Sequence, residues 1–168
     1  TSLSPVSFTI NTSGDIFVGS ISGGGIFRST DNGDNWAQIN QGLTNYQILS
    51  LTNSNGYIFA GTSGGGVFRS TDNGNNWVQI NNGVCGQNGQ GYFVFSLAIN
   101  SSGHIFAGTG DGVFRSTDNG NNWVEINQGL TSIGVLSLGI NSNGVIFAGT
   151  LDGVFQSVIS VNLKVYLQ

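Results

Sequence analysis

Charged residues are scarce in this chain of 168 residues, where they make up only 7% and where Lys and Arg together number four. Typical soluble domains are about one quarter charged. A nucleic-acid-binding protein needs clustered Lys and Arg to neutralise phosphates, so the composition argues against that class of partner. Apolar runs are also short, well below the roughly 20 residues of a membrane-spanning helix, and we expect no membrane span.

Cysteine and histidine occur once each, as Cys85 and His104. A single cysteine excludes a disulfide within the chain and a zinc site with several cysteine ligands. No motif surrounds Cys85, so we interpret it as a free loop thiol. His104 has no partner histidine or cysteine, and we expect neither a metal nor a cofactor. The chain begins at Thr1 with no recognisable signal peptide, which is typical of a processed or trimmed product.

Glycine, with 28 residues, and asparagine take the place of the missing charges. Apolar residues still make up 38% of the chain, with 11 Phe among them, and this content argues for a packed core rather than disorder.

One unit is repeated four times. IFVGS at 16–20 returns as IFAGT at 58–62, 105–109 and 146–150. A glycine-rich link and a segment such as VFRS follow each copy, and the serine that ends this segment recurs at spacings of 41, 46 and 41 residues. Each unit contains short runs rich in Val, Ile and Phe between Gly and Asn, which predict four short strands.

A repeat of this length with four strands is typical of a β-propeller blade. The sequence therefore predicts an all-β fold, a β-propeller of four four-stranded antiparallel blades in a single domain, 1–168. We place the blades at approximately 5–43, 44–84, 92–131 and 133–168, with the last one degenerate. Three forms of closure stay open. The four blades close on themselves, two chains pair into an eight-bladed ring, or the chain is part of a longer propeller. Open apolar blade faces favour a homodimer.

A polar stretch opens the fourth strand of the first three units: RSTDNGDNW at 28–36 and RSTDNGNNW at 69–77 and 115–123. An Asp two residues before a Gly can accept backbone N–H groups across its own turn, and the Gly can take a positive φ. The Trp that follows is expected to pack against the hairpin. We therefore interpret the stretch as a structural turn, made by Ser29, Asp31, Gly33, Trp36, Ser70, Asp72, Gly74, Trp77, Ser116, Asp118, Gly120 and Trp123. A calcium loop, the alternative, would end in a bidentate Glu that is missing here.

The pattern S-T-D-x-G-x-x-W resembles the Asp-box, or bacterial neuraminidase repeat. The family's consensus usually has Thr before the aromatic residue, where this chain has Asn35, Asn76 and Asn122. The resemblance implies a β-propeller but no single activity, because the motif occurs in sialidases, xyloglucan hydrolases, photosystem assembly factors and sorting receptors. The composition also resembles that of extracellular bacterial Asp-box proteins, which implies a secreted or cell-surface protein.

The resemblance to sialidases implies three arginines that converge on a substrate, with a Tyr–Glu pair. Arg28, Arg69 and Arg115 number three, but they occupy the same place in three different blades and are not expected to converge. Glu125 is the only Glu and aligns with exposed Gln positions. We therefore expect no enzyme of that type.

The loops that differ most between units are the connections between units and the links between second and third strands, so we expect the working face there. Amide, carboxylate and aromatic side chains on this face suit a neutral polar ligand such as a glycan, or a protein partner. The candidate ligand-binding residues are Tyr46, Gln87, Asn88, Gln90, Tyr92, Asp111 and Asp152.

Three functions follow as hypotheses: a binding module without chemistry, a glycoside hydrolase with Asp111 and Asp152 as acid and base, or a purely structural repeat array. Because propellers host many functions, the fold alone does not choose among them.

Overall fold

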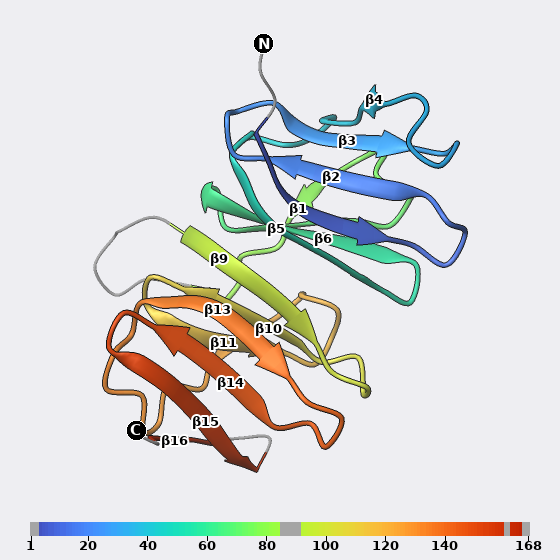
Figure 1. Cartoon of the computed structure of the whole chain (residues 1–168). Helices are drawn as coiled ribbons and strands as arrows, with labels where there is room; N and C mark the ends of the chain where they lie inside the picture. The colour runs from blue at the N-terminus through green and yellow to red at the C-terminus, as the bar shows by residue number, and fades with distance from the viewer. Residues whose placement is uncertain (1–3, 85–91, 160–161, 166–168) are drawn as a thin grey trace.

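The structure, a computed structural model, describes residues 4–84, 92–159 and 162–165, which form sixteen β-strands (Figure 1). Within these residues no helix is long and apolar enough to cross a membrane. Each group of four consecutive strands is an antiparallel meander in which neighbours in sequence are neighbours in the sheet. We call these groups blades 1 to 4.

The strands follow one another in the same order in every blade. Blade 1 contains β1 (Pro5–Ile10), β2 (Ile16–Ser20), β3 (Gly25–Ser29) and β4 (Ala37–Gln38), and blade 2 contains β5 (Ile48–Ser54), β6 (Tyr57–Gly64), β7 (Val67–Ser70) and β8 (Val78–Gln79). Blade 3 contains β9 (Tyr92–Ile99), β10 (Ile105–Thr109), β11 (Gly112–Ser116) and β12 (Val124–Glu125), and blade 4 contains β13 (Val135–Ile140), β14 (Ile146–Thr150), β15 (Gly153–Ile159) and β16 (Asn162–Val165).

The fourth strand is short in blades 1 to 3, where it has two residues, as in β8. Beyond the end of this strand, an asparagine side chain takes over the hydrogen bonds that a longer strand would make through its backbone. Asn81 Oδ1 accepts the N–H of Val67 at 2.8 Å, and Asn81 Nδ2 donates to the carbonyl of Gly65 at 3.0 Å. Asn40 and Asn127 make the equivalent bonds in blades 1 and 3.

Blades 2 and 3 share a short additional pairing. The far end of β6 pairs with the start of β9, Ser63 with Phe93 and Gly64 with Tyr92, so that the two blades form one continuous sheet at this point. The four-blade pattern did not predict this link between sheets.

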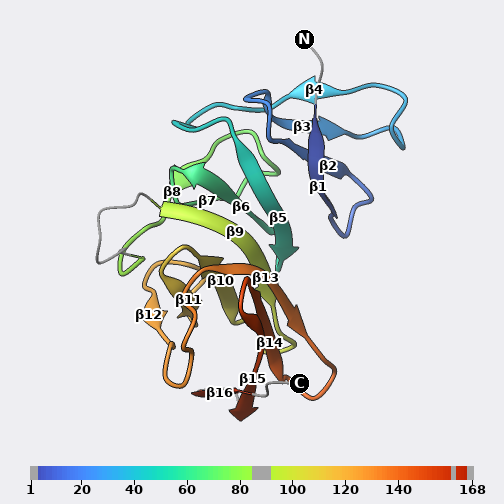
Figure 2. The same cartoon turned by 60° about the vertical axis from the view of Figure 1, so that its left-hand side comes forward.

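The four blades form an open arc. Their first strands, β1, β5, β9 and β13, lie side by side, each in contact with the next. Blade 1 lies at one end of the arc and blade 4 at the other, and the chain ends lie far apart in both views (Figures 1 and 2). The four blades therefore do not close on themselves, which removes that form of closure.

Three apolar cores lie between successive blades. The first brings Phe17, Ile26, Ile39 and Leu43 of blade 1 against Ile48, Leu51, Ile58, Ala60, Phe68 and Trp77 of blade 2. The junctions between blades 2 and 3 and between blades 3 and 4 repeat this core with residues at equivalent positions. Because every core is shared by two blades, a single blade has no core of its own.

The glycines of the IFAGT segments in blades 2 and 3 make room for the next blade. A Cβ added to Gly61 of β6 would lie 2.7 Å from Cγ1 of Val94 in blade 3, and one added to Gly108 would lie 2.8 Å from Cγ1 of Val135 in blade 4. Both distances are closer than carbon atoms pack, so the close approach of neighbouring blades requires glycine here.

Candidate functional site

The repeated polar turns are held by the same hydrogen bonds in blades 1 to 3. In blade 2, Ser70 Oγ donates to Asp72 Oδ1 at 2.9 Å and accepts the N–H of Gly74 at 2.8 Å. The two oxygens of Asp72 accept the backbone N–H and the side-chain amide of Asn76, at 2.8 and 2.7 Å. Both carboxylate oxygens are therefore engaged within the turn. The equivalent Ser–Asp–Gly–Asn sets are Ser29, Asp31, Gly33 and Asn35, and Ser116, Asp118, Gly120 and Asn122.

These bonds stabilise the charged carboxylates. The side-chain amide of Asn76 makes the largest contribution to a lowered pKa of Asp72, and Asn35 and Asn122 do the same for the pKa of Asp31 and of Asp118. In the described ranges, no group of three or more His, Cys, Asp or Glu side chains is placed to hold a metal ion.

The tryptophan after each turn packs differently from the expectation. Trp77 and Trp123 lie against the preceding blade and not only against their own hairpin: their Nε1 groups donate to the carbonyls of Ile39 and Ile80 at 2.8 Å. Both rings are buried, with 3% and 4% of their surface exposed. Trp36 has no preceding blade in the chain, is 43% exposed, and donates to Gly33 of its own turn.

The repeated arginines join neighbouring blades. Arg28 Nη1 in blade 1 donates to the carbonyl of Asn73 in blade 2 at 2.5 Å, and Arg69 Nη1 in blade 2 donates to the carbonyl of Asn119 in blade 3 at 2.6 Å. Arg28 and Arg69 therefore lie in two separate blade junctions, and each is engaged by the turn of the next blade. This arrangement does not form a converging arginine site.

The candidate ligand-binding residues that the structure describes lie at the opposite end of the blades from these turns. We call this end the rim; it consists of the links between second and third strands and the connections that lead into each first strand. Tyr46 and Tyr92 occupy equivalent rim positions, two residues before the buried Ile48 and Val94. Their side chains are 48% and 37% exposed.

The rim tyrosines are fixed through their backbone. The carbonyl of Tyr46 accepts the N–H of Gly25 at 2.9 Å, and the carbonyl of Tyr92 accepts the N–H of Gly66 at 2.9 Å. Each bond joins a tyrosine to the link of the preceding blade, and that link is rich in glycine. The structure thus places two exposed aromatic rings in the same setting on adjacent blades, beside links that have few side chains. Gln87, Asn88, Gln90 and Cys85 lie outside the described residues.

Asp111 and Asp152 occupy equivalent tight turns in blades 3 and 4. Their backbone N–H groups donate to Thr109 Oγ1 at 3.1 Å and to Thr150 Oγ1 at 3.2 Å, and the same hydroxyls donate to the carbonyls of Gly112 and Gly153. The backbone of both residues thus serves the turn, while the Asp111 side chain is half-buried and that of Asp152 exposed.

A polar groove that the sequence did not single out lies between blades 1 and 2, at the end that carries the polar turns. It has a volume of about 660 Å³. Asn11, Asn53, Tyr57 and Asn73 are among the residues that line it. Asn11 Nδ2 donates to Asn73 Oδ1 at 2.8 Å, so part of this polar surface is already paired across the two blades. The recurrent Asn in the turns between first and second strands is the signal that points to this groove.

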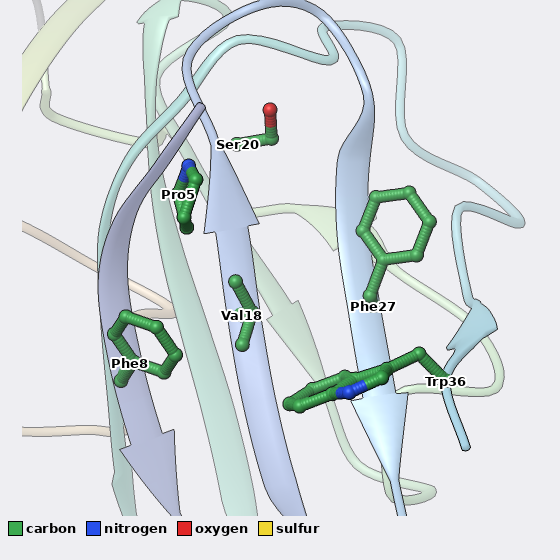
Figure 3. Close-up of a pocket in the computed structure, with 6 residues that line it drawn as sticks. All are labelled: Pro5, Phe8, Val18, Ser20, Phe27 and Trp36. Carbon is green, nitrogen blue, oxygen red and sulfur yellow. The ribbon is translucent and has the colours of Figure 1, made fainter. Parts of the chain in front are cut away.

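An apolar hollow of about 440 Å³ lies on the outer side of blade 1 (Figure 3). The rings of Phe8, Phe27 and Trp36 surround Val18 on this side of the sheet, with Pro5 at the edge. The hollow contains almost no polar group, so it lacks the hydrogen-bonding partners that a glycan or a charged ligand requires.

Solved structures with a similar fold are β-propellers. The chain matches an ancestral GH74 enzyme with a TM-score of 0.77 and 19% identity, over 100% of this chain and 25% of that one. It matches the extracellular domain of a putative hybrid two-component system from B. thetaiotaomicron with a TM-score of 0.79 and 17% identity, over 98% of this chain and 22% of that one. Virginiamycin B lyase from Staphylococcus aureus matches with a TM-score of 0.73 and 15% identity, over 97% of this chain and 56% of the lyase.

The fold is a β-propeller. No protein-family model matches the sequence, and the comparison with curated proteins found no match. The chain spans a quarter or less of the first two relatives and about half of the lyase. Since enzymes and an extracellular domain of a signalling system share this fold, the likeness supports a propeller module in general.

Proposed function

We propose that this chain is an extracellular Asp-box propeller module that binds a glycan at its rim and has no chemistry of its own. The observation that carries the proposal is the pair of exposed tyrosines, Tyr46 and Tyr92, at equivalent positions on neighbouring blades. Sugar rings stack on such aromatic faces, and a rigid scaffold under the rings lowers the entropy lost on binding. The extracellular domain among the structural relatives supports the location.

The test is a glycan array followed by titration with the best binder. Tyr46→Ala and Tyr92→Ala are each expected to weaken binding at least about tenfold, because each removes one stacking surface. Tyr46→Phe and Tyr92→Phe are the matched controls and should keep most of the affinity, because the ring remains. Glycan binding that survives both alanine substitutions would contradict the proposal. If the chain binds a protein and no glycan, the ligand is a protein and the glycan proposal is wrong.

The alternative function is glycoside hydrolysis with Asp111 and Asp152 as acid and base. It is favoured by their equivalent positions in turns of adjacent blades at the same rim. The test is hydrolysis of an aryl glycoside or of xyloglucan by the wild type and by Asp111→Asn. Activity in the wild type that the substitution abolishes would establish this function and would exclude a module that only binds. A chain that neither binds nor hydrolyses glycans would be the structural repeat array.

A further inference from the structure

Successive blades meet through the same contacts at all three junctions of the chain. A serine hydroxyl in the first strand of one blade accepts the N–H of a leucine in the first strand of the next. The pairs are Ser7 with Leu51 at 2.8 Å, Ser50 with Leu97 at 3.0 Å, and Ser96 with Leu138 at 3.0 Å. The junction is therefore a repeated interface with defined residue pairs. A further blade at either end of the arc could make the same contacts.

Blade 1 presents one half of this interface to solvent. We call this surface the N-terminal face; it consists of Pro5, Phe8, Val18, Phe27 and Trp36 around the hollow of Figure 3. Residues at equivalent positions in blade 2 are all buried in the first core: Ile48, Leu51, Ala60, Phe68 and Trp77. By contrast, Phe8 is 60% exposed and Trp36 43% exposed. The N-terminal face thus has the apolar composition of the buried surface between blades 1 and 2, but it is exposed to solvent.

Blade 4 presents the other half. We call this surface the C-terminal face; it consists of Ser137, Phe147, Gly149 and Val154. In blades 1 to 3 the residues equivalent to Val154 are fully buried by the next blade, whereas Val154 is 57% exposed. Ser137, which follows Ser7, Ser50 and Ser96 in the repeat, is exposed as well.

Gly149 is the most informative residue of the C-terminal face. At the equivalent positions, Gly61 and Gly108 admit a side chain of the next blade. Near Gly149, the three atoms nearest to an added Cβ all belong to Ser137 of the same blade, and its Oγ is the nearest of them. Blade 4 thus keeps the glycine that admits the next blade in blades 2 and 3, and within the described residues the Ser137 hydroxyl lies in that place.

We infer that two copies of this chain pair head to tail, the N-terminal face of each on the C-terminal face of the other, and so close an eight-bladed ring. In this ring Ser137 accepts the N–H of Phe8 of the other copy, as Ser96 accepts that of Leu138 within one chain. Pro5 takes the place at Gly149 that Val94 takes at Gly61, because the Ser137 hydroxyl turns from Gly149 towards the N–H of Phe8. None of the residues that define the two faces is charged, so no charge is desolvated.

The occupant is a second copy because both halves of the interface are present in one chain. Contacts of this head-to-tail kind close into a ring when the rotation between copies fits, and otherwise continue as a filament. Blade 1 and blade 4 lie at the two ends of the arc (Figure 2), and a ring of two copies joins each such end to the other end of the partner copy. The inference is independent of the proposed glycan site, which lies on the rim and not on either face.

The first measurement is the mass of the chain in solution by light scattering coupled to size exclusion. A single species of twice the 17.5 kDa chain mass is expected. A species of one chain mass at all concentrations would overturn the inference, and a distribution of larger masses would overturn the closed ring.

Two substitutions test which faces meet. Phe8→Asp and Val154→Asp place a carboxylate in the centre of the N-terminal and the C-terminal face, and each should weaken pairing at least about 100-fold. Both side chains are more than half exposed in the single chain, so each variant should fold and keep the wild-type circular dichroism. Val78→Asp is the matched control: Val78 is 61% exposed on the outer strand β8, away from both faces, and this variant should still pair.

Mixing the two variants separates head-to-tail pairing from any other arrangement. A pair with one Phe8→Asp chain and one Val154→Asp chain has one contact between two unchanged faces, so the mixture should form the two-chain species although neither variant does alone. If Phe8→Asp abolishes pairing while Val154→Asp leaves it intact, the N-terminal faces meet each other and the head-to-tail inference is wrong. A mixture that remains at one chain mass would also contradict it.

Discussion

At the scale of single residues, the Asp side chains of the polar turns make the stability of the fold depend on pH. The hydrogen bonds from Asn76 and from the backbone lower the pKa of Asp72 in the folded state, while the unfolded chain has the ordinary value of 3.8. A lowered folded pKa means that the carboxylate stabilises the fold fully above pH 3.8. This stability is lost as the pH falls below that value towards the folded pKa. Asp31 and Asp118 act in the same direction.

We therefore expect Asp72→Asn to lower the free energy of unfolding by about 1 kcal/mol at pH 6, because Asn cannot accept both bonds from Asn76. The difference between the variant and the wild type should be smaller at pH 2.5, because the stability that the charged Asp72 contributes is lost progressively below pH 3.8. Urea unfolding at the two pH values measures both. Asp34→Asn is the control, since Asp34 lies in the equivalent turn of blade 1 and no comparable set of side-chain bonds is seen for it among the described residues. A difference that stays constant between pH 6 and pH 2.5 would show that the charge has no part in the turn.

Single residues also show what the sequence can and cannot predict. The bonds of Asp72 reach residues no more than four positions away, so turn chemistry alone suggested them. The partners of Trp77 and Arg69 lie 38 and 50 positions away. Those partners depend on how blades stack, which no local pattern specifies. Asn81 was overlooked for a related reason, because its side chain replaces backbone pairing and resembles any other loop asparagine.

At the scale of the blade, substitution of the tryptophans shows how much the contact between neighbouring blades contributes to stability. Trp77→Phe removes the bond from Nε1 to the buried carbonyl of Ile39 and leaves a void in the first core. We expect a loss of about 2–3 kcal/mol in the free energy of unfolding. Trp36→Phe should cost less than about 1 kcal/mol in the single chain, because Trp36 is 43% exposed.

Chemical denaturation of both variants in the Phe8→Asp background measures these effects without a contribution from pairing. Equal losses at Trp36 and Trp77 would indicate that the ring stabilises its own hairpin and not the junction between blades. That result would restore the simpler expectation from the sequence.

The order of the strands follows from the sequence more readily than their length. The repeats of IFAGT and VFRS indicated the second and third strands because their Val, Ile and Phe residues are buried on both faces. The fourth strands of blades 1 to 3 have only two residues because they lie at the outer edge, where one asparagine satisfies the neighbouring strand. The added pairing between β6 and β9 depends on a glycine-rich link, whose sequence leaves its path open.

At the scale of the whole molecule, the arc ends in two complementary apolar faces. The sequence indicated that such faces would be open, but it left three forms of closure, because the angle between blades is a property of their packing. The arc removes closure within one chain. An eight-bladed ring would also place the rim residues Tyr46 and Tyr92 of both copies around one channel mouth, and so give the proposed glycan site two-fold symmetry.

The central claim is that the N-terminal face is buried by a second copy, and Trp36 reports on it directly. Labelling with 5-fluorotryptophan gives three ¹⁹F resonances, from Trp36, Trp77 and Trp123, and the change in shift between H₂O and D₂O measures the exposure of each ring. The account predicts three protected resonances in the wild-type protein and one exposed resonance in Phe8→Asp, assigned by Trp36→Phe. A wild-type Trp36 that is as exposed to solvent as in the Phe8→Asp variant would contradict it.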